Sequence, residues 1–120
     1  MIISHFIDAP MVSRANSSSH VLILNQMMRF LCYYTGIPSP TIQWQHNGTD
    51  IGLARPGDGR NFTIQDVYMY DSTQQGTYTC RVTNSLGVAE ASYSVRLGNI
   101  SAILISLCIY VEMEYIYLAI

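Results

Sequence analysis

The sequence predicts an all-β fold in which two sheets pack face to face as a sandwich. Short segments of alternating apolar and polar residues recur along the chain, and none has the periodicity of an amphipathic helix. A cysteine, a tryptophan twelve residues later and a Tyr-x-Cys triplet have the spacing found at the centre of such a sandwich. The length of 120 residues corresponds to one domain.

The expected strands follow one another in chain order, with short turns between them. Residues 9–12 form an edge strand, because an edge tolerates the proline at position 10. Residues 14–20 form a serine-rich loop, and the prolines of 36–40 favour an extended turn. The other expected strands are 21–24, 27–34, 41–46, 50–53, 61–66, 76–83 and 88–97.

The alternation along each strand assigns its side chains to the core or to solvent. Outward-facing residues are Arg29, Leu31 and Tyr33 on one sheet, and Gln43, Gln45, Arg81 and Thr83 on the other. The expected inward-facing sets are Met28, Phe30, Cys32 and Tyr34; Ile42 and Trp44; Phe62 and Ile64, with Val67 beneath them; Tyr78, Cys80 and Val82; and Ala91, Tyr93 and Val95.

These residues resemble the immunoglobulin superfamily, and their flanking sequence resembles its intermediate set. The matching series runs from about Pro10 to Leu97 and includes Gly-x-Pro-x-Pro at 36–40 and Gly-Thr-Tyr-Thr-Cys at 76–80. The resemblance implies an immunoglobulin-like Greek-key β-sandwich of two antiparallel sheets, stapled by a disulfide and built around family signature residues. The implied disulfide joins Cys32 and Cys80, and the implied signature residues are Trp44, Gly76 and Tyr78.

The chain departs from the family pattern just before the second cysteine. Family members place an aspartate six residues before that cysteine, where this chain has Gln74, and Asp71 lies three residues earlier. The inserted residues leave open whether Asp71 pairs with Arg55 or Arg60. They also leave open whether the hydroxyl of Tyr78 bonds backward to the chain as a tyrosine corner.

Composition and sequons point to an oxidising compartment outside the cytosol. Charged residues make up 12% of the chain, the net charge is −2 and lysine is absent, so no basic patch for nucleic acid exists. The cysteine pattern and four N-glycosylation sequons, at Asn16, Asn47, Asn61 and Asn99, favour an extracellular or cell-surface location within a longer chain. Asn47 is the best glycan candidate because Asn-Gly predicts an exposed turn, and Asn47→Gln is expected to leave folding nearly unchanged.

The two ends of the chain differ from the expected immunoglobulin-like domain at residues 9–98. Residues 1–8 form an N-terminal extension that lacks the features of a secretory signal peptide. Residues 99–120 form an apolar tail whose two glutamates make it a marginal membrane span. A non-native extension, a membrane-associated segment and an extra sandwich strand all stay open for this tail, and Cys108 within it has no assigned partner.

No residues combine into a recognisable catalytic or metal-binding pattern. His5, His20 and His46 lie far apart, with no carboxylate or thiol at the spacing of metal ligands. The glycines around Asp58 lack the strand–helix context of a phosphate-binding loop. We therefore expect no enzymatic activity, no metal and no cofactor.

The sequence favours a non-catalytic extracellular module for protein recognition or cell adhesion, as part of a larger cell-surface protein or receptor. Its expected partners are other proteins, such as a cell-surface or matrix ligand or a second copy of the chain. Nucleic acid is not expected, and contact with a membrane would involve the C-terminal tail. Two alternatives are an intracellular structural domain of the muscle-filament type and an ectodomain segment of a receptor kinase or phosphatase.

We predict that Trp44→Ala lowers the free energy of unfolding by about 3–5 kcal/mol, because it truncates a large core side chain. Denaturant unfolding followed by fluorescence or circular dichroism measures this change. A loss below about 1 kcal/mol would place Trp44 outside the core and contradict the strand assignment.

Overall fold

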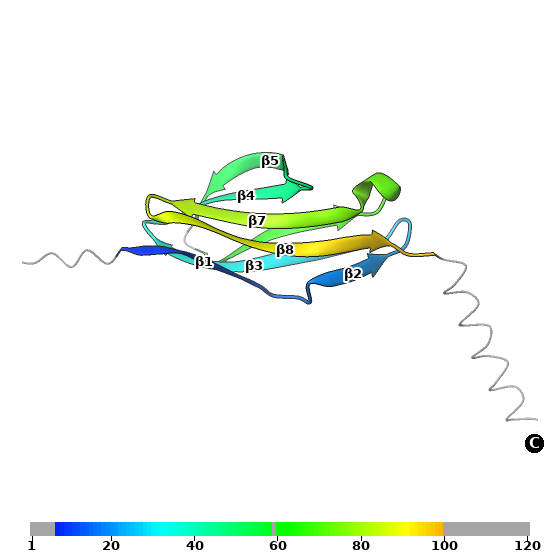
Figure 1. Ribbon diagram of the computed structural model, residues 1–120, viewed down its shortest axis with the longest axis horizontal. Coiled ribbons are helices and arrows are strands. Elements are labelled where there is room, and N and C mark those ends of the chain that lie inside the picture. The colour runs from blue at the N-terminus through cyan, green and yellow to red at the C-terminus, as the bar shows by residue number, and fades with distance from the viewer. Residues whose placement is uncertain (1–6, 59, 100–120) are drawn as a thin grey trace, which may run out of the picture.

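The computed structural model describes residues 7–58 and 60–99 of the chain. These residues form eight β-strands and one short 3-10 helix, so the all-β prediction is confirmed (Figure 1). The elements are β1 (Asp8–Arg14), β2 (Ser19–Leu22), β3 (Met27–Ile37), β4 (Thr41–His46), β5 (Thr49–Pro56), β6 (Phe62–Tyr68), η1 (Ser72–Gln74), β7 (Gly76–Asn84) and β8 (Gly87–Leu97).

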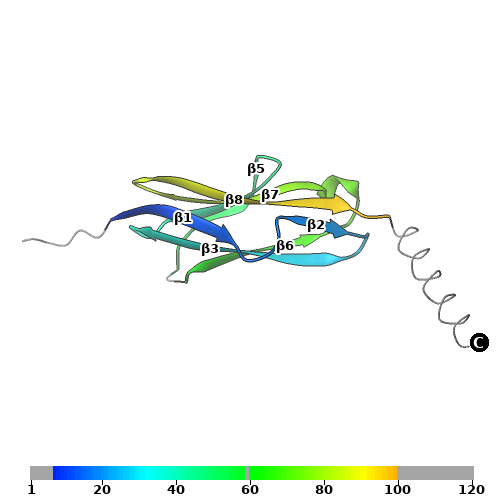
Figure 2. The ribbon, with the colours of Figure 1, turned by 60° about the horizontal axis from the view of Figure 1, so that its bottom comes forward.

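The strands form two layers, which Figure 2 shows from the side. The smaller sheet has the order β1-β3-β6, and the larger sheet has the order β2-β8-β7-β4-β5. All pairs are antiparallel except β2 with β8, which run parallel, so the larger sheet departs from the expected antiparallel pattern. Most of the N-terminal extension and the C-terminal tail, with His5 and Cys108, lies outside the described residues. No helix in the described part of the chain is long and apolar enough to cross a membrane.

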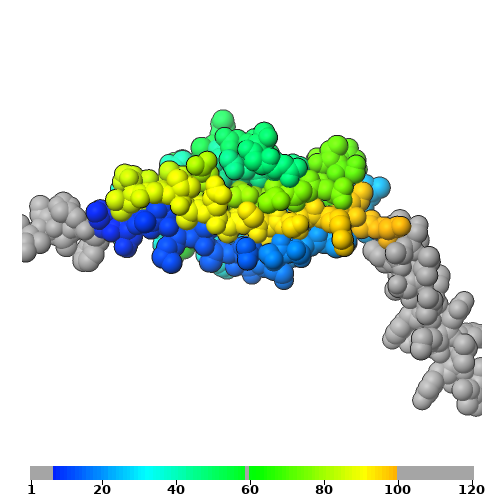
Figure 3. All heavy atoms as spheres, in the orientation of Figure 1, coloured from blue at the N-terminus to red at the C-terminus, as the bar shows by residue number. Residues whose placement is uncertain are grey.

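The chain changes sheets between β1 and β2, and the hydroxyl of Tyr93 holds this crossover in place. Tyr93 is 0% exposed. Its oxygen accepts hydrogen bonds from the backbone N–H groups of Ala15 (3.0 Å) and Asn16 (3.3 Å), and its hydroxyl donates to the carbonyl of Leu31. One side chain of β8 therefore links the crossover to β3, and Figure 3 shows β1 and β2 (blue) lying along β8 (yellow to orange).

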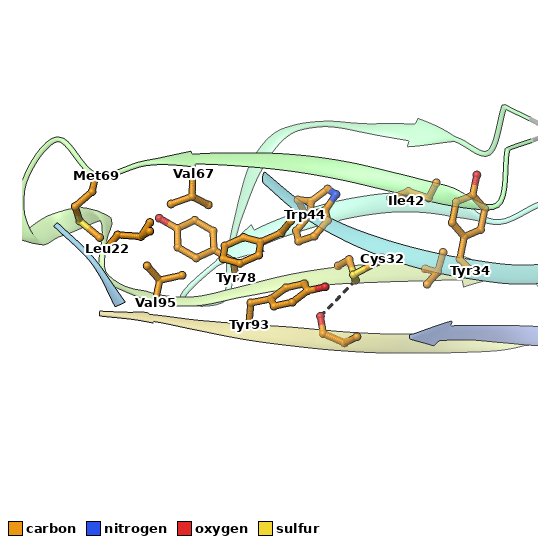
Figure 4. Packing of buried hydrophobic residues seen from close by; sticks show 14 residues of the cluster. Leu22, Cys32, Tyr34, Ile42, Trp44, Val67, Met69, Tyr78, Tyr93 and Val95 are labelled. Atoms are coloured by element: carbon orange, nitrogen blue, oxygen red, sulfur yellow. Dashed lines mark hydrogen bonds between the residues drawn. A yellow bond between two sulfur atoms is a disulfide. The ribbon is translucent and has the colours of Figure 1, made fainter. Parts of the chain in front are cut away.

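The core lies between the sheets and is centred on a disulfide between Cys32 of β3 and Cys80 of β7. Their Cα atoms lie 6.6 Å apart, and Trp44 stands opposite Cys80 in the β4–β7 ladder (Figure 4). The dashed line in Figure 4 marks a 3.4 Å contact between the Cys80 sulfur and the Ala91 carbonyl oxygen. This contact is not a true hydrogen bond, because a sulfur atom in a disulfide carries no proton. The predicted inward-facing residues of β3, β4, β7 and β8 are buried or half-buried, as expected.

In β6 the predicted inward positions of Phe62 and Ile64 are wrong, whereas the predicted burial of Val67 is confirmed. Thr63 and Val67 face the core with 6% and 2% exposure, whereas Phe62 and Ile64 are only half-buried. Thr63 lies directly opposite Cys32, and opposed residues of an antiparallel pair share one face of the sheet. The hydroxyl of Thr63 accepts a hydrogen bond from the Trp44 indole at 3.0 Å, which gives that buried N–H its partner.

The loop before β7 is longer than the family pattern, yet it keeps the backward bond of a tyrosine corner. The Tyr78 hydroxyl donates to the carbonyl of Gln74 at 2.6 Å. Asp71 caps η1, accepting from the Thr73 backbone N–H at 2.9 Å. Hydrogen bonds from the Thr73 hydroxyl and backbone lower the pKa of Asp71. Asp71 therefore pairs with neither of the two arginines considered from the sequence.

We predict that Tyr93→Phe lowers the free energy of unfolding by about 1–3 kcal/mol, because the change removes three hydrogen bonds to the backbone, although the Ala15 N–H still donates to the Leu31 carbonyl. The matched control is Tyr33→Phe on the exposed side of β3, where the same deletion should cost less than about 0.5 kcal/mol. Urea unfolding of both variants measures the difference. Equal losses in the two variants would show that the Tyr93 hydroxyl does not hold the crossover.

Candidate functional site

The outer face of the smaller sheet carries five large apolar side chains. Met11 is 71% exposed and Tyr33 is 48% exposed, and both point away from the core. Leu31, Phe62 and Ile64 are half-buried. They lie on the same face as Tyr33, because Phe62 pairs with Tyr33 and Ile64 pairs with Leu31 in the β3–β6 ladder. These five side chains share the outer face of the smaller sheet, across β1, β3 and β6, with Ser13 and Thr35 between Met11 and Tyr33.

A shallow groove of about 300 Å³ runs along this face next to Met11 and Tyr33. Its lining also includes Asn61, one of the four sequon asparagines. Toward the opposite end of the face, Arg29 donates two hydrogen bonds to the carboxylate of Asp66, at 2.8 and 3.1 Å. Those hydrogen bonds lower the pKa of Asp66, although both side chains are exposed, so the pair contributes little to stability.

The outer face of the larger sheet carries charged and polar side chains. Arg81 and Glu90 lie opposite each other on β7 and β8, with their nearest charged atoms 3.5 Å apart. Gln45 of β4 donates to the Asp50 carboxylate at 2.9 Å, and Gln43 donates to the Trp44 carbonyl at 2.9 Å. The residues predicted to face outward do so on both sheets. The strands of the larger sheet also expose apolar side chains, at Val21, Leu53 and Val88, but these lie on three different strands.

The described residues show no arrangement of groups for metal binding: no three of His, Cys, Asp and Glu come together within them. His46 lies 2.7 Å from the Gln75 carbonyl through Nε2 and stacks on Tyr78 with ring centroids 4.3 Å apart. His20 similarly contacts the Ser17 carbonyl at 2.6 Å and lies near the Phe30 ring. Both histidines therefore serve local packing.

The structure places the sequon asparagines in different surroundings. Asn16 is exposed in the crossover between β1 and β2, and Asn99 is exposed after β8. Asn61 is exposed beside the groove. Thr63, the third residue of that sequon, has a separate structural role as the acceptor of the Trp44 indole. Glycan occupancy at all four positions stays a prediction.

Asn47 has a structural role that the sequence analysis missed. Its backbone has φ of 50° and that of Gly48 has φ of 83°, as the two-residue turn between β4 and β5 requires. Its side-chain oxygen accepts from the backbone N–H of Thr77 at 2.9 Å. A Cβ at Gly76 would lie 2.1 Å from that oxygen, so Gly76 leaves the space that Asn47 occupies. We therefore no longer expect Asn47→Gln to leave folding nearly unchanged; the substitution should destabilise the fold.

We predict that Asn47→Gln lowers the free energy of unfolding by about 1–2 kcal/mol. The substitution removes the hydrogen bond from the Thr77 N–H, and glutamine adopts the left-handed backbone conformation of this position less readily than asparagine. Gly76→Ala should cost at least about 1–3 kcal/mol through strain and the clash with Asn47. Thr49→Ala is the matched control, since it destroys the same sequon from an exposed position and should cost less than about 0.5 kcal/mol. If Thr49→Ala were as destabilising as Asn47→Gln, the loss would come from the glycan.

Comparison with known proteins identifies the family. A family model for the immunoglobulin I-set domain matches residues 10–97. Hemicentin-1 of Homo sapiens is 33% identical over 87 residues, covering 68% of this chain and 2% of that protein. Neural cell adhesion molecule L1 of Rattus norvegicus is 37% identical over 82 residues, covering 67% of this chain and 6% of that protein. The chain thus spans a small part of the relatives it matches.

Solved structures show the same fold. The M4 domain of titin superposes with a TM-score of 0.64 at 19% identity, covering 78% of this chain and 99% of that one. The N-terminal four Ig domains of Dscam1 isoform 4.44 give a TM-score of 0.62 at 25% identity, covering 77% of this chain and 21% of that one. The titin likeness shows the fold alone. With its disulfide, its buried tryptophan and its tyrosine corner in place, this chain belongs to the immunoglobulin I-set family.

Proposed function

We propose that this chain is a non-catalytic module that recognises other proteins outside the cell, as one domain of a larger cell-surface or adhesion protein. The observation that carries the proposal is the apolar outer face of the smaller sheet. Contiguous exposed apolar surface rimmed by polar residues is typical of protein–protein contact sites. Aromatic and methionine side chains such as Tyr33 and Met11 are enriched in such contacts.

The sandwich supports this role by holding the face rigid. Its disulfide and core restrain β3 directly, so Leu31 and Tyr33 need little ordering when a partner binds. The disulfide and the sequons favour an oxidising compartment. Relatives of this chain include proteins named as cell adhesion molecules, from rat and from Drosophila melanogaster. The partner would be a cell-surface or matrix protein, or a second copy of this chain.

An intracellular structural domain is the second candidate, because an immunoglobulin-like sandwich does not by itself fix the function or the compartment. In that setting the same sandwich would space or bear load between neighbours, and the sequons would be accidental.

Free-thiol measurement separates the two candidates. The chain purified from its native source should carry Cys32 and Cys80 as a disulfide, with neither thiol reacting with a maleimide before reduction. The reason is that an oxidising compartment preserves disulfides whereas the cytosol keeps thiols reduced. Two reactive thiols at these positions, together with no glycan, would select the intracellular structural role.

The binding face is tested by surface substitution. Met11→Ser combined with Tyr33→Ser should weaken binding of the multimerised chain to cells, or its self-association, by about tenfold or more. The reason is that a few large anchor side chains, aromatic ones above all, carry most of the binding energy of an interface. The control is Arg81→Gln combined with Glu90→Gln, a charge-neutral double change on the outer face of the larger sheet. Flow cytometry and sedimentation velocity provide the readouts. Loss of binding in the control, with normal binding in the first variant, would move the contact surface to the larger sheet.

A further inference from the structure

A narrow opening lies between the sheets on the side where β5 and β6 are the outermost strands. Arg55 of β5 reaches across this opening, and its Nη2 donates to the Thr63 hydroxyl oxygen of β6 at 3.0 Å. The same oxygen accepts from the Trp44 indole at 3.0 Å. The guanidinium of Arg55 is therefore held at a defined position at the edge of the core.

A pocket of about 110 Å³ occupies one end of this opening. That volume exceeds what a single water molecule fills. Its lining includes the charged groups of Arg55, Arg60 and Asp58. Arg60 Nε lies 3.5 Å from the nearer carboxylate oxygen of Asp58, longer than a tight charged hydrogen bond. Two guanidinium groups and one carboxylate leave the pocket with an excess of positive charge.

The hydroxyl of Tyr34 is a buried donor at this pocket. Tyr34 is 4% exposed, and although the Asp58 backbone approaches its oxygen, no described group accepts the hydroxyl proton in a hydrogen bond. Figure 4 shows this oxygen pointing away from the disulfide. Burial and the Asp58 carboxylate raise the pKa of Tyr34, while the Asp58 backbone and the two arginines oppose them, so the group stays protonated at neutral pH. The hydroxyls of Tyr78 and Tyr93 are both hydrogen-bonded, and an unpaired buried hydroxyl destabilises a fold.

We propose that this pocket binds one small oxyanion, a carboxylate or a sulfate group, which accepts hydrogen bonds from the Tyr34 hydroxyl and the Arg55 and Arg60 guanidiniums. The ligand would supply the acceptor that Tyr34 lacks, and it would balance the excess positive charge. Guanidinium groups suit this task because their planar N–H pairs match the oxygens of carboxylates and similar anions. The proposal does not depend on the apolar face or on the compartment in which the protein works.

Titration of the full chain with two anions tests the pocket. Sodium acetate and sodium sulfate are added separately to the isotope-labelled, oxidised protein, with sodium chloride keeping the ionic strength constant. Backbone amide shifts of Arg55, Asp58 and Arg60 should saturate with at least one of them, and the comparison tells a planar from a tetrahedral ligand. Tyr34→Phe should weaken this binding about fivefold through the lost hydrogen bond, and Arg60→Gln should weaken it at least as much.

Matched variants separate a specific site from general screening. Arg29→Gln replaces an exposed arginine on the outer face of the smaller sheet and should leave the affinity unchanged. The Tyr34→Phe variant should melt at the same temperature as the unchanged protein or higher, because it removes a hydroxyl that donates to no acceptor. Arg60 is exposed, so the Arg60→Gln variant should fold normally. The proposal is overturned if neither anion gives saturable shifts, which would leave water alone in the pocket. It is equally overturned if Tyr34→Phe and Arg60→Gln bind normally, or if Arg29→Gln weakens binding as much as they do.

Discussion

The hydrogen bond between the Trp44 indole and the Thr63 hydroxyl is the constraint on which the outer surface of the smaller sheet depends. Trp44 packs beside the Cys32–Cys80 disulfide, so its N–H is buried and must find an acceptor. Thr63 meets that need only by facing inward. Side chains alternate along a strand, and Phe62 and Ile64 must then face outward. A polar requirement in the core thus produces the apolar face proposed for recognition.

Three buried tyrosines show how one residue type takes different roles in this sandwich. The Tyr93 hydroxyl bonds the crossover and β3, and the Tyr78 hydroxyl bonds the lengthened loop before β7. Both hydroxyls form hydrogen bonds with backbone groups. The Tyr34 hydroxyl lies beside two arginines and donates to no described acceptor, so a group that is structural elsewhere is available to a ligand here.

Asn47 illustrates the limit of reading modification sites from short motifs. The Asn-Gly pair suggests an exposed turn, and the turn is there. The side chain, however, bonds Thr77 at the start of β7 and fills the space that Gly76 leaves. The residue that most resembled a glycan acceptor is therefore a contact between two strands of the larger sheet, whose partner lies 30 residues away in the sequence.

The sequence by itself determined the sandwich, its strand order along the chain and the inward sets of β3, β4, β7 and β8, because alternation and turn residues act locally. It also indicated the disulfide pair through the family resemblance. Only the tertiary structure decided the alternation of β6, the sheet change between β1 and β2 and the role of Asn47. Each depends on a hydrogen bond between residues far apart in the chain: Trp44 with Thr63, Tyr93 with Ala15, and Asn47 with Thr77. Local periodicity in the sequence does not specify which distant donor will form a hydrogen bond with a buried acceptor. Such long-range hydrogen bonds determine which side chains face outward, and the proposed functions depend on those side chains.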